Sequence, residues 1–257
     1  MNLERGISVI ICCYNSASRI KTTLRYLALQ DIGGKFECEI IVVNNASTDE
    51  TEAVVNQLWH ECDNPYPLKI TFEKTPGLGF ARKRGVKEAK CSYGVFCDDD
   101  NWLAPDYLLR VFNIFESNSK IGVIGGASMP VFDNTAPPWF YTNCGCYAVG
   151  IQAKNTGDIT HRGYVWGAGM AFRTWLLQKI FESNINPLLI DRKKDVLTSG
   201  GDREISAGFI FGGYRLWYDQ KLIFQHYIPD KRLTSSYYEK LLAGLRNSKI
   251  YTVYYHY

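Results

Sequence analysis

The chain has 257 residues, of which 46% are hydrophobic and 21% are charged, and these fractions exclude a disordered or collagen-like protein. Basic residues exceed acidic ones by only three, 29 against 26, so the field typical of nucleic-acid-binding proteins is absent and we expect no nucleic-acid partner. No stretch approaches the roughly 18 uncharged apolar residues of a membrane span, and the apolar run at 7–13 is too short for a signal-peptide core. We therefore expect a cytoplasmic protein.

Short apolar runs alternate with helical patterns through the first hundred residues. Runs of β-branched and aromatic residues predict strands at 7–13, 39–43, 69–73 and 93–97. Hydrophobic residues at helical spacing predict helices around 20–28, 48–59 and 80–89, with a glycine loop at 77–79. This alternation predicts an α/β fold whose sheet is mostly parallel and doubly wound.

The pattern is weaker after residue 110. Strands are predicted at 121–126 and 165–172, helices at 174–181 and 202–211, and short strands at 214–218 and 222–226, while 130–150 is rich in loop residues. A basic, tyrosine-rich tail follows. The sequence therefore predicts one domain with halves at 1–110 and 111–234, and a tail at 235–257.

The eight cysteines predict neither a disulfide framework nor a zinc site. Cys12 and Cys13 lie inside an apolar run, where thiols act as small buried hydrophobes. Cys144 and Cys146 form a CxC pair with no second pair at zinc-ligand spacing. We expect reduced thiols throughout.

Polar residues follow three of the predicted strands, at the point where each strand ends. They are Tyr14-Asn15, Asn44-Asn45 and Asp98-Asp99-Asp100. The carboxyl ends of parallel strands meet at one edge of a sheet, where ligands bind, so we expect these side chains to share a crevice. Carboxylate oxygens suit Mg²⁺ or Mn²⁺ beside a diphosphate, and the alternative is an acidic turn that faces water.

Four segments of the first half carry a family resemblance: SVIICCYNSA (8–17), EIIVVNNASTDET (39–51), GLGFARKRGVKEA (77–89) and VFCDDDNWLAPDYL (95–108). With them, the chain resembles the family-2 inverting glycosyltransferases of the glycosyltransferase-A fold. WGAGMAFR (166–173) and SGGDREI (199–205) are similar to that family's acceptor-side segments. The resemblance implies the nucleotide-diphospho-sugar transferase type of sheet, a nucleotide-sugar-binding half at 1–110, an acceptor-binding half at 111–234, and a divalent Mn or Mg cofactor.

The resemblance also implies roles for single residues on the donor side. Asp98 would contact the ribose or sugar with help from Asp99. Asp100 would ligate the metal, with His226 as a further metal or phosphate contact or, alternatively, a structural histidine. The other donor-binding residues would line the nucleoside pocket or reach the phosphates, and they are Tyr14, Asn15, Asn44, Asn45 and Arg82. The alternative for Arg82 is a solvated, basic helix face.

On the acceptor side, the resemblance implies that Asp202 is the general base, with Glu204 as its substitute. A helix N-cap is the alternative for Asp202, since Gly-Asp before a helical stretch suits capping. Trp166, Gly167 and Glu204 would bind the acceptor. Trp139 would stack on an acceptor sugar or, alternatively, close a core.

Two positions depart from the family pattern. Position 44 is Asn where the family commonly has Asp, so the expected contact to the nucleotide base carries no charge and the identity of the base is open. Position 201 is Gly where an acidic residue is frequent, so the assignment of the general base depends mainly on Asp202.

The resulting hypothesis is a metal-dependent inverting glycosyltransferase with a nucleotide-diphosphate sugar donor, of UDP type, and a glycan or lipid-linked acceptor. Bacterial-type surface polysaccharide or glycoconjugate assembly is the expected process. A sugar-phosphate nucleotidyltransferase is one alternative, but it would need a Gly-rich basic loop where this chain has Tyr14-Asn15. A non-catalytic sugar-nucleotide-binding or glycan-binding relative is the other. The basic, tyrosine-rich tail favours either peripheral contact with the inner face of a membrane or a dimer surface.

Overall fold

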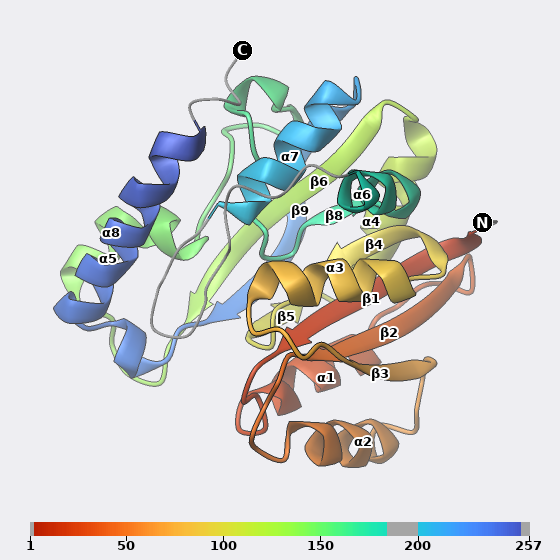
Figure 1. The fold of residues 1–257 in the computed structure, drawn as a ribbon, viewed down its shortest axis with the longest axis horizontal. Coiled ribbons are helices and arrows are strands. Elements are labelled where there is room, and N and C mark those ends of the chain that lie inside the picture. Colours follow the sequence, from red (N-terminus) through yellow and green to blue (C-terminus); the bar gives the residue numbers. More distant parts are fainter. Residues whose placement is uncertain (1–2, 184–199, 253–257) are drawn as a thin grey trace.

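The computed structural model describes residues 3–183 and 200–252, and within them nine strands form one sheet (Figure 1). Their order is β3-β2-β1-β4-β8-β6-β9-β5, with β7 paired to β9. The four strands of the first half are parallel, and they are β1 (Glu4–Cys13), β2 (Glu37–Asn44), β3 (Leu68–Phe72) and β4 (Cys91–Phe96). The middles of β1 and β2 are buried on both faces, which is why they read as continuous apolar runs in the sequence.

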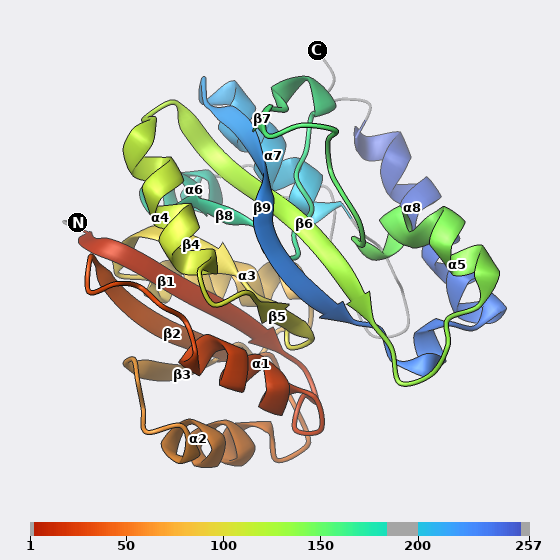
Figure 2. The ribbon, with the colours of Figure 1, turned by 180° about the vertical axis from the view of Figure 1, so that it is seen from behind.

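Helices cover both faces of the sheet (Figures 1 and 2). One face packs around Val9 and Ile11 of β1, and its helices are α1 (Ile20–Ala28), α2 (Thr51–Glu61) and α4 (Tyr107–Ser117). The other packs around Ile10, and its helices are α3 (Leu78–Glu88), α6 (Thr174–Glu182) and α7 (Gly201–Phe211). The predicted doubly wound α/β class is confirmed.

The second half of the sheet is mixed in direction. β6 (Ile121–Val131) and β9 (Arg215–Tyr227) are parallel to each other. The strands that pair in antiparallel fashion are β8 (Ala171–Arg173), β5 (Asn101–Leu103) and β7 (Gly157–Asp158). The parallel character is thus concentrated in the first half, where the β-α alternation is regular.

Several boundaries differ from the prediction. The short strands predicted at 214–218 and 222–226 form one strand, β9, because residues 219–222 make a bulge against β6 between Gly125 and Ala127. The strand predicted at 165–172 is reduced to β8, since Gly169 has a φ of +69° that interrupts an extended run. The loop at 77–79 is shorter than predicted, because α3 begins at Leu78. β5 and α4 lie where no element was predicted.

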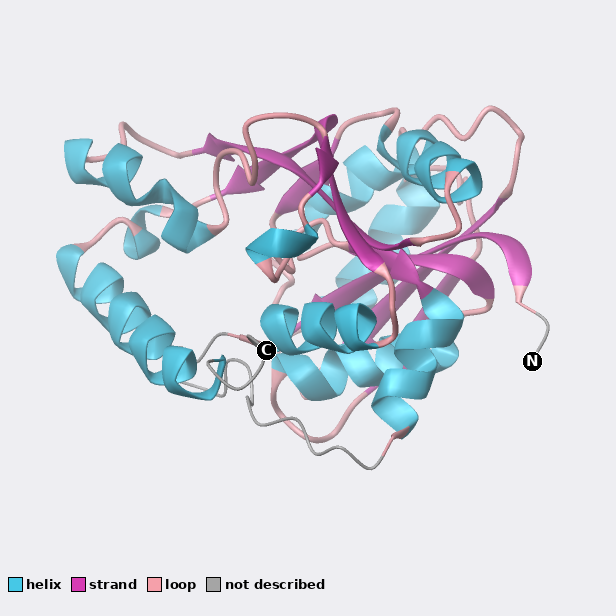
Figure 3. Ribbon diagram, turned by 90° about the horizontal axis from the view of Figure 1, so that it is seen from above, coloured by secondary structure: helices cyan, strands magenta, loops and turns pink. Residues whose placement is uncertain are grey.

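The described part of the tail, up to residue 252, is helical. α8 (Ser235–Thr252) follows the 3₁₀ turn η3 (Asp230–Arg232) and packs beside α5 (Pro138–Asn143) and η1 (Cys144–Tyr147) in a small core of its own. Figure 3 shows α5 and α8 standing to one side of the sheet. Across the described ranges, no helix has the length and apolarity that crossing a bilayer requires.

Candidate functional site

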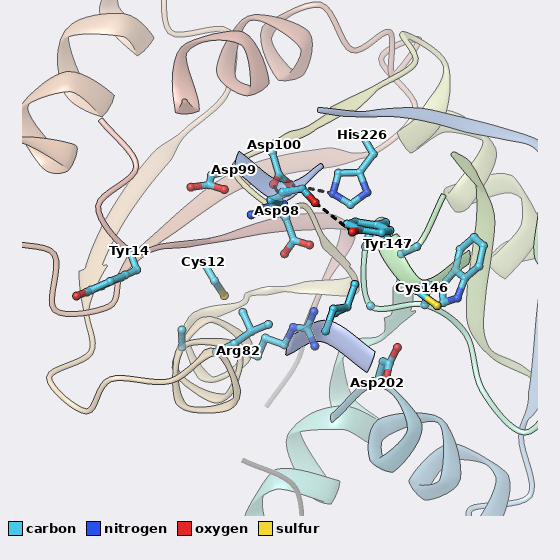
Figure 4. A pocket seen from close by; sticks show the side chains of 18 of the residues that line it. Cys12, Tyr14, Arg82, Asp98, Asp99, Asp100, Cys146, Tyr147, Asp202 and His226 are labelled. Carbon is cyan, nitrogen blue, oxygen red and sulfur yellow. Dashed lines mark hydrogen bonds and ion pairs between the residues drawn. The ribbon is translucent and has the colours of Figure 1, made fainter. Parts of the chain in front are cut away.

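A cavity of about 1290 Å³ opens where the parallel strands end, and α8 contributes to its far wall. The predicted site residues that line it are Tyr14, Asn15, Asn45, Arg82, Asp98, Asp99, Asp100, Trp166, Gly167, Asp202 and His226. Asn44, Trp139 and Glu204 are not among the described residues that line it. Figure 4 shows the acidic triplet on one wall, Arg82 below it and Asp202 across the cavity.

The turns after β1 and β2 are tied together by side-chain hydrogen bonds. Asn15 has a left-handed backbone with a φ of +50°, and its Oδ1 accepts a 2.8 Å bond from the Thr48 N–H. The Asn15 N–H donates to Ser47 Oγ at 3.0 Å. Tyr14, beside it, is half exposed, and its ring extends away from the carboxylates (Figure 4). Asn15 therefore shapes the rim that carries Tyr14.

The side chains of the two asparagines after β2 form hydrogen bonds that hold neighbouring loops in place. Asn44 Oδ1 accepts a 3.0 Å bond from the Ser47 N–H. Asn45 Oδ1 accepts a 2.8 Å bond from the Gly77 N–H, and its Nδ2 donates to the Thr75 carbonyl at 2.7 Å. Asn45 thus positions the start of α3. The predicted contact between Asn44 and a nucleotide base gains no geometric support, because Asn44 lies outside the cavity lining.

Asp99 is a structural carboxylate. Its Oδ2 accepts hydrogen bonds from Ser16 Oγ and from Arg19 Nη2, the latter at 2.5 Å, and its carbonyl accepts a 2.9 Å bond from Thr23 Oγ1. Burial and the neighbouring Asp100 charge raise the pKa of Asp99, and the Arg19 charge opposes that rise. These contacts fasten α1 to the end of β4, so Asp99 supports the site and a direct role on the donor is not favoured.

Asp100 is held between two basic side chains. Its Oδ2 accepts a 2.9 Å bond from Arg232 Nη1, and its Oδ1 lies 3.5 Å from His226 Nε2. The β5–β9 pairing makes this possible, because Asn101 is opposite His226 in the register and the Tyr227 N–H donates to the Asp100 carbonyl at 2.9 Å. Asp100 is only 3% exposed, so these contacts hold the orientation of its side chain.

The pair Asp100 and His226 fits one divalent ion. Two ligands at right angles on Mg²⁺ or Mn²⁺ lie about 3 Å apart, close to the 3.5 Å that separates their facing atoms. Within the described residues, no group of three or more His, Cys, Asp or Glu side chains gathers closely enough to hold a metal by itself. Ions of this kind usually take one or two protein ligands, with waters and substrate phosphates completing the shell.

Arg82 is buried, so the alternative prediction of a solvated helix face is wrong for this residue. It is 5% exposed, and its Cζ lies 4.9 Å from the centroid of the Phe96 ring. Gly167 makes room for it, because a Cβ at that position would be 2.5 Å from Arg82 Nη2. Gly167 therefore leaves the space that the Arg82 side chain occupies. The sequence alone does not show that these two residues are in contact.

Asp202 lies in the first turn of α7, and its carboxylate faces the cavity (Figure 4). Gly200, with a φ of +145°, occupies the N-cap position, so Asp202 is not the N-cap residue, although its Oδ1 accepts a 2.9 Å bond from the Arg203 N–H in the first turn. Trp166 lies nearby in the same wall and is buried. Glu204, two residues further along α7, is outside the lining, so its predicted acceptor role gains no geometric support.

Trp139 packs against α8. Its ring centroid lies 5.1 Å from that of Tyr238, and the Tyr238 hydroxyl donates to Asn143 Oδ1 at 2.7 Å. Trp139 therefore closes a core with α8, which was the alternative to stacking on an acceptor sugar. We leave Trp139 out of the proposed acceptor site.

Sequence reasoning missed six basic side chains that line the cavity: Arg19, Arg162, Arg203, Lys231, Arg232 and Arg246. Nothing in the local sequence of Arg232 points to Asp100. Arg203 lies inside the segment 199–205, where it was given no role, and Arg19 follows the segment 8–17. These residues come together only in the folded chain, because each lies on a loop or helix that the local sequence does not connect with the strand ends.

The fold agrees with that of solved glycosyltransferases. S. aureus TarS, residues 1–349, superposes with a TM-score of 0.65 over 91% of this chain and 63% of that chain, at 21% identity. The mannosyltransferase PcManGT from Pyrobaculum calidifontis gives 0.63 over 91% and 61%, at 18% identity. The fold is therefore that of the glycosyltransferase-A class.

The sequence profile of "Glycosyl transferase family 2" matches residues 8–180, well over half of the chain. The chain belongs to this family. It is 32% identical over 139 residues to the poly(ribitol-phosphate) beta-glucosyltransferase of Bacillus spizizenii, which covers 51% of this chain and 22% of that protein. It is 26% identical over 121 residues to the poly-beta-1,6-N-acetyl-D-glucosamine synthase of Staphylococcus epidermidis, covering 47% and 28%. The matched part thus spans about a quarter of these relatives.

Proposed function

We propose that the chain is a metal-dependent inverting glycosyltransferase that moves a sugar from a nucleotide-diphosphate donor to an acceptor hydroxyl. A glycan or lipid-linked acceptor, in the assembly of bacterial-type surface polysaccharide or glycoconjugate, is the expected setting. The observation that carries the proposal is a single cavity with Asp98, Asp100 and His226 on one wall and Asp202 across it.

The relatives support a nucleotide-sugar donor. TarS has been solved with UDP-GlcNAc and with UDP, and PcManGT with GDP-Man and Mn²⁺. We take UDP as the favoured nucleotide. Tyr14, Asn15 and Asn45 line the part of the cavity on which the nucleoside would rest, and Asp98, which also lines it, would contact the ribose or sugar.

Asp100 and His226, with Asp98 beside them, are the residues that would hold the metal. When bound, Mn²⁺ or Mg²⁺ neutralises negative charge on the departing diphosphate. Arg232 would remain hydrogen-bonded to the other oxygen of Asp100, where its guanidinium holds that carboxylate in position. Arg82 would bind phosphate oxygens from the floor of the cavity, because its planar guanidinium is already held there by Phe96.

Asp202 would accept the proton of the acceptor hydroxyl as that oxygen attacks the anomeric carbon. A single displacement from the face opposite the diphosphate inverts the anomeric centre and needs one base, in contrast to the two close carboxyl groups of retaining hydrolases. Burial raises the pKa of Cys12, whose thiol lines the same cavity, to about 12, so it does not offer a competing thiolate nucleophile.

Titration of the chain with UDP, with and without Mn²⁺, tests the proposal directly. We expect UDP to bind in both cases and at least about tenfold more tightly with Mn²⁺, because the ion would link the diphosphate to Asp100. Isothermal titration calorimetry measures both affinities, and adenosine is the control ligand without phosphates. Absence of binding by UDP and by GDP would contradict the proposal.

Gly167→Ala should weaken UDP binding about tenfold with little change in the free energy of unfolding, because the added Cβ would displace the Arg82 guanidinium from the phosphates. Gly79→Ala is the matched control. It lies on the same helix as Arg82. Apart from its chain neighbours and the backbone of its own helix, no heavy atom of residues 3–183 and 200–252 lies within 4 Å of the place that its added methyl group would take. Calorimetry of the two variants measures the difference. Equal UDP affinity in both would separate Gly167 from the donor site.

Peripheral membrane contact is a further part of the proposal. α8 and η3 carry the exposed basic residues Lys231, Lys240 and Arg246, of which Lys231 and Arg246 also line the cavity. A basic side chain near an anionic lipid surface adds about 1 kcal/mol of attraction. Co-sedimentation with vesicles that contain anionic lipid is expected to exceed that with neutral vesicles, and equal sedimentation would argue against the contact. Deleting 235–257 is unsuitable as a test, because Leu241 of α8 belongs to a core cluster.

A further inference from the structure

Two arginines on the Asp202 side of the cavity contact the same aromatic ring. The Cζ atom of Arg203 lies 3.7 Å from the centroid of the Tyr164 ring, and that of Arg162 lies 4.1 Å from the same centroid. Arg162 also lies 5.4 Å from the Trp166 ring. All four side chains line the cavity together with Asp202. The two positive charges are thus held close to each other and close to the candidate base.

The guanidinium of Arg162 is fixed from behind. Its Nη1 donates to Gln152 Oε1 at 2.9 Å and to the Tyr164 carbonyl at 2.8 Å. Gln152 is buried, and its Nε2 donates to the Gly126 carbonyl of β6 at 2.9 Å. The arginine is therefore anchored to the sheet through a buried amide, which is the kind of support that preorganises a binding group.

These charges have no carboxylate partner at ion-pair distance in the described ranges. The arginine ion pairs there involve Arg5, Arg19, Arg84, Arg110, Arg215 and Arg232. Burial lowers the pKa of Arg162 and the Arg203 charge adds to this, while Tyr164 and Asp202 oppose it. A partly buried charge without a counter-ion is costly, so an anion within reach of the Arg162 and Arg203 guanidinium groups would be stabilised.

We propose that Arg162 and Arg203 bind an anionic group of the acceptor, a phosphate ester or a carboxylate, next to the hydroxyl that Asp202 deprotonates. The inference rests on the proposed function, because it takes the Asp202 wall as the acceptor side. Guanidinium groups match the oxygens of phosphate and carboxylate in bidentate geometry. A neutral sugar would leave both charges without compensation. Arg82 and the proposed metal ion would face the donor diphosphate, so Arg162 and Arg203 are available to the second substrate.

A two-stage titration tests the inference. The chain is first saturated with UDP and Mn²⁺, so that the donor side is occupied, and small probes are then added. Glycerol 1-phosphate and D-glucuronate are the charged probes, and glycerol and D-glucose are their uncharged counterparts. We expect at least one charged probe to bind about tenfold or more tightly than its uncharged counterpart. The probe that binds more tightly identifies phosphate or carboxylate as the preferred group.

Arg203→Gln should weaken binding of the preferred charged probe roughly tenfold to a hundredfold, and Arg203→Lys should restore part of the loss because it keeps the charge. Arg203 is the variant of choice because its described side-chain contact is with the Tyr164 ring alone, so the fold does not depend on it. Arg246→Gln, which removes a cavity arginine on α8, is the matched control and should leave the affinity unchanged.

Equal affinity for charged and uncharged probes, or unchanged affinity in both Arg203→Gln and Arg162→Gln, would overturn the inference. UDP binding in the first stage distinguishes the two failures. If UDP binds and the charged probes do not, the acceptor inference alone fails. If no UDP binds, the proposed function fails and the inference fails with it.

Discussion

Asp202→Asn is expected to lower the rate of sugar transfer by a factor of about 10² to 10⁴ while leaving the affinity for the nucleotide donor unchanged. An amide has the size of the carboxylate but cannot accept the proton of the attacking hydroxyl. The Arg203 N–H bond to Asp202 Oδ1, at 2.9 Å, is one that an amide oxygen keeps, so the start of α7 should be preserved. Release of UDP in the presence of acceptor measures the rate, and calorimetry with UDP measures the affinity.

Glu204→Gln is the matched control for Asp202→Asn. It neutralises a carboxylate in the same helical turn, but one that does not line the cavity. Its transfer rate should stay close to that of the unmodified chain. Full activity of Asp202→Asn would remove Asp202 from the mechanism, and loss of activity in Glu204→Gln alone would move the base to Glu204.

Asp100→Asn should abolish the effect of Mn²⁺ on UDP binding and reduce transfer by at least about a hundredfold, because the variant removes the charged ligand of the ion. The same change leaves Arg232 without its anionic partner. Since the Asp100 side chain is 4% exposed and that of Arg232 18%, the free energy of unfolding should fall by about 3 kcal/mol. Calorimetry with and without Mn²⁺ and denaturant unfolding measure the two effects separately.

Asp99→Asn separates stability from metal binding. Asp99 pairs with Arg19 at 2.5 Å, so its neutralisation should also destabilise the fold. The Mn²⁺ effect on UDP binding should nevertheless persist, because Asp99 faces α1 instead of His226. If Asp99→Asn lost the Mn²⁺ effect and Asp100→Asn kept it, the roles assigned to the two carboxylates would be reversed.

The convergence of the strand-end residues was predictable from the sequence. Continuous β-branched runs mark buried parallel strands, and parallel strands place their carboxyl ends at one edge of the sheet. That reasoning correctly brought Asn15, Asp98 and Asp100 into one cavity. The first half of the sheet was predictable for the same reason, because local pattern and topology agree there.

Other features depend on contacts that local sequence does not encode. Arg232 reaches Asp100 because β9 runs unbroken through a bulge, while the turn-like residues at 219–221 predict a stop. Trp139 packs on α8, and that helix was not predicted because its sequence has weak apolar periodicity. The Asn44 side chain lies outside the cavity lining because its Oδ1 accepts a hydrogen bond from the Ser47 N–H of the same turn. The sequence motif alone is compatible both with this local bond and with a bond to a ligand.

The central claim is that Asp100 and His226 hold a divalent ion against the diphosphate of the donor. Crystals grown with UDP and Mn²⁺ test it most directly, through anomalous diffraction at the manganese edge. The account predicts one anomalous peak within about 2.3 Å of both Asp100 Oδ1 and His226 Nε2, with UDP phosphate oxygens completing its shell. Bound UDP with no manganese peak at that position, or a peak only at carboxylates elsewhere on the chain, would contradict it.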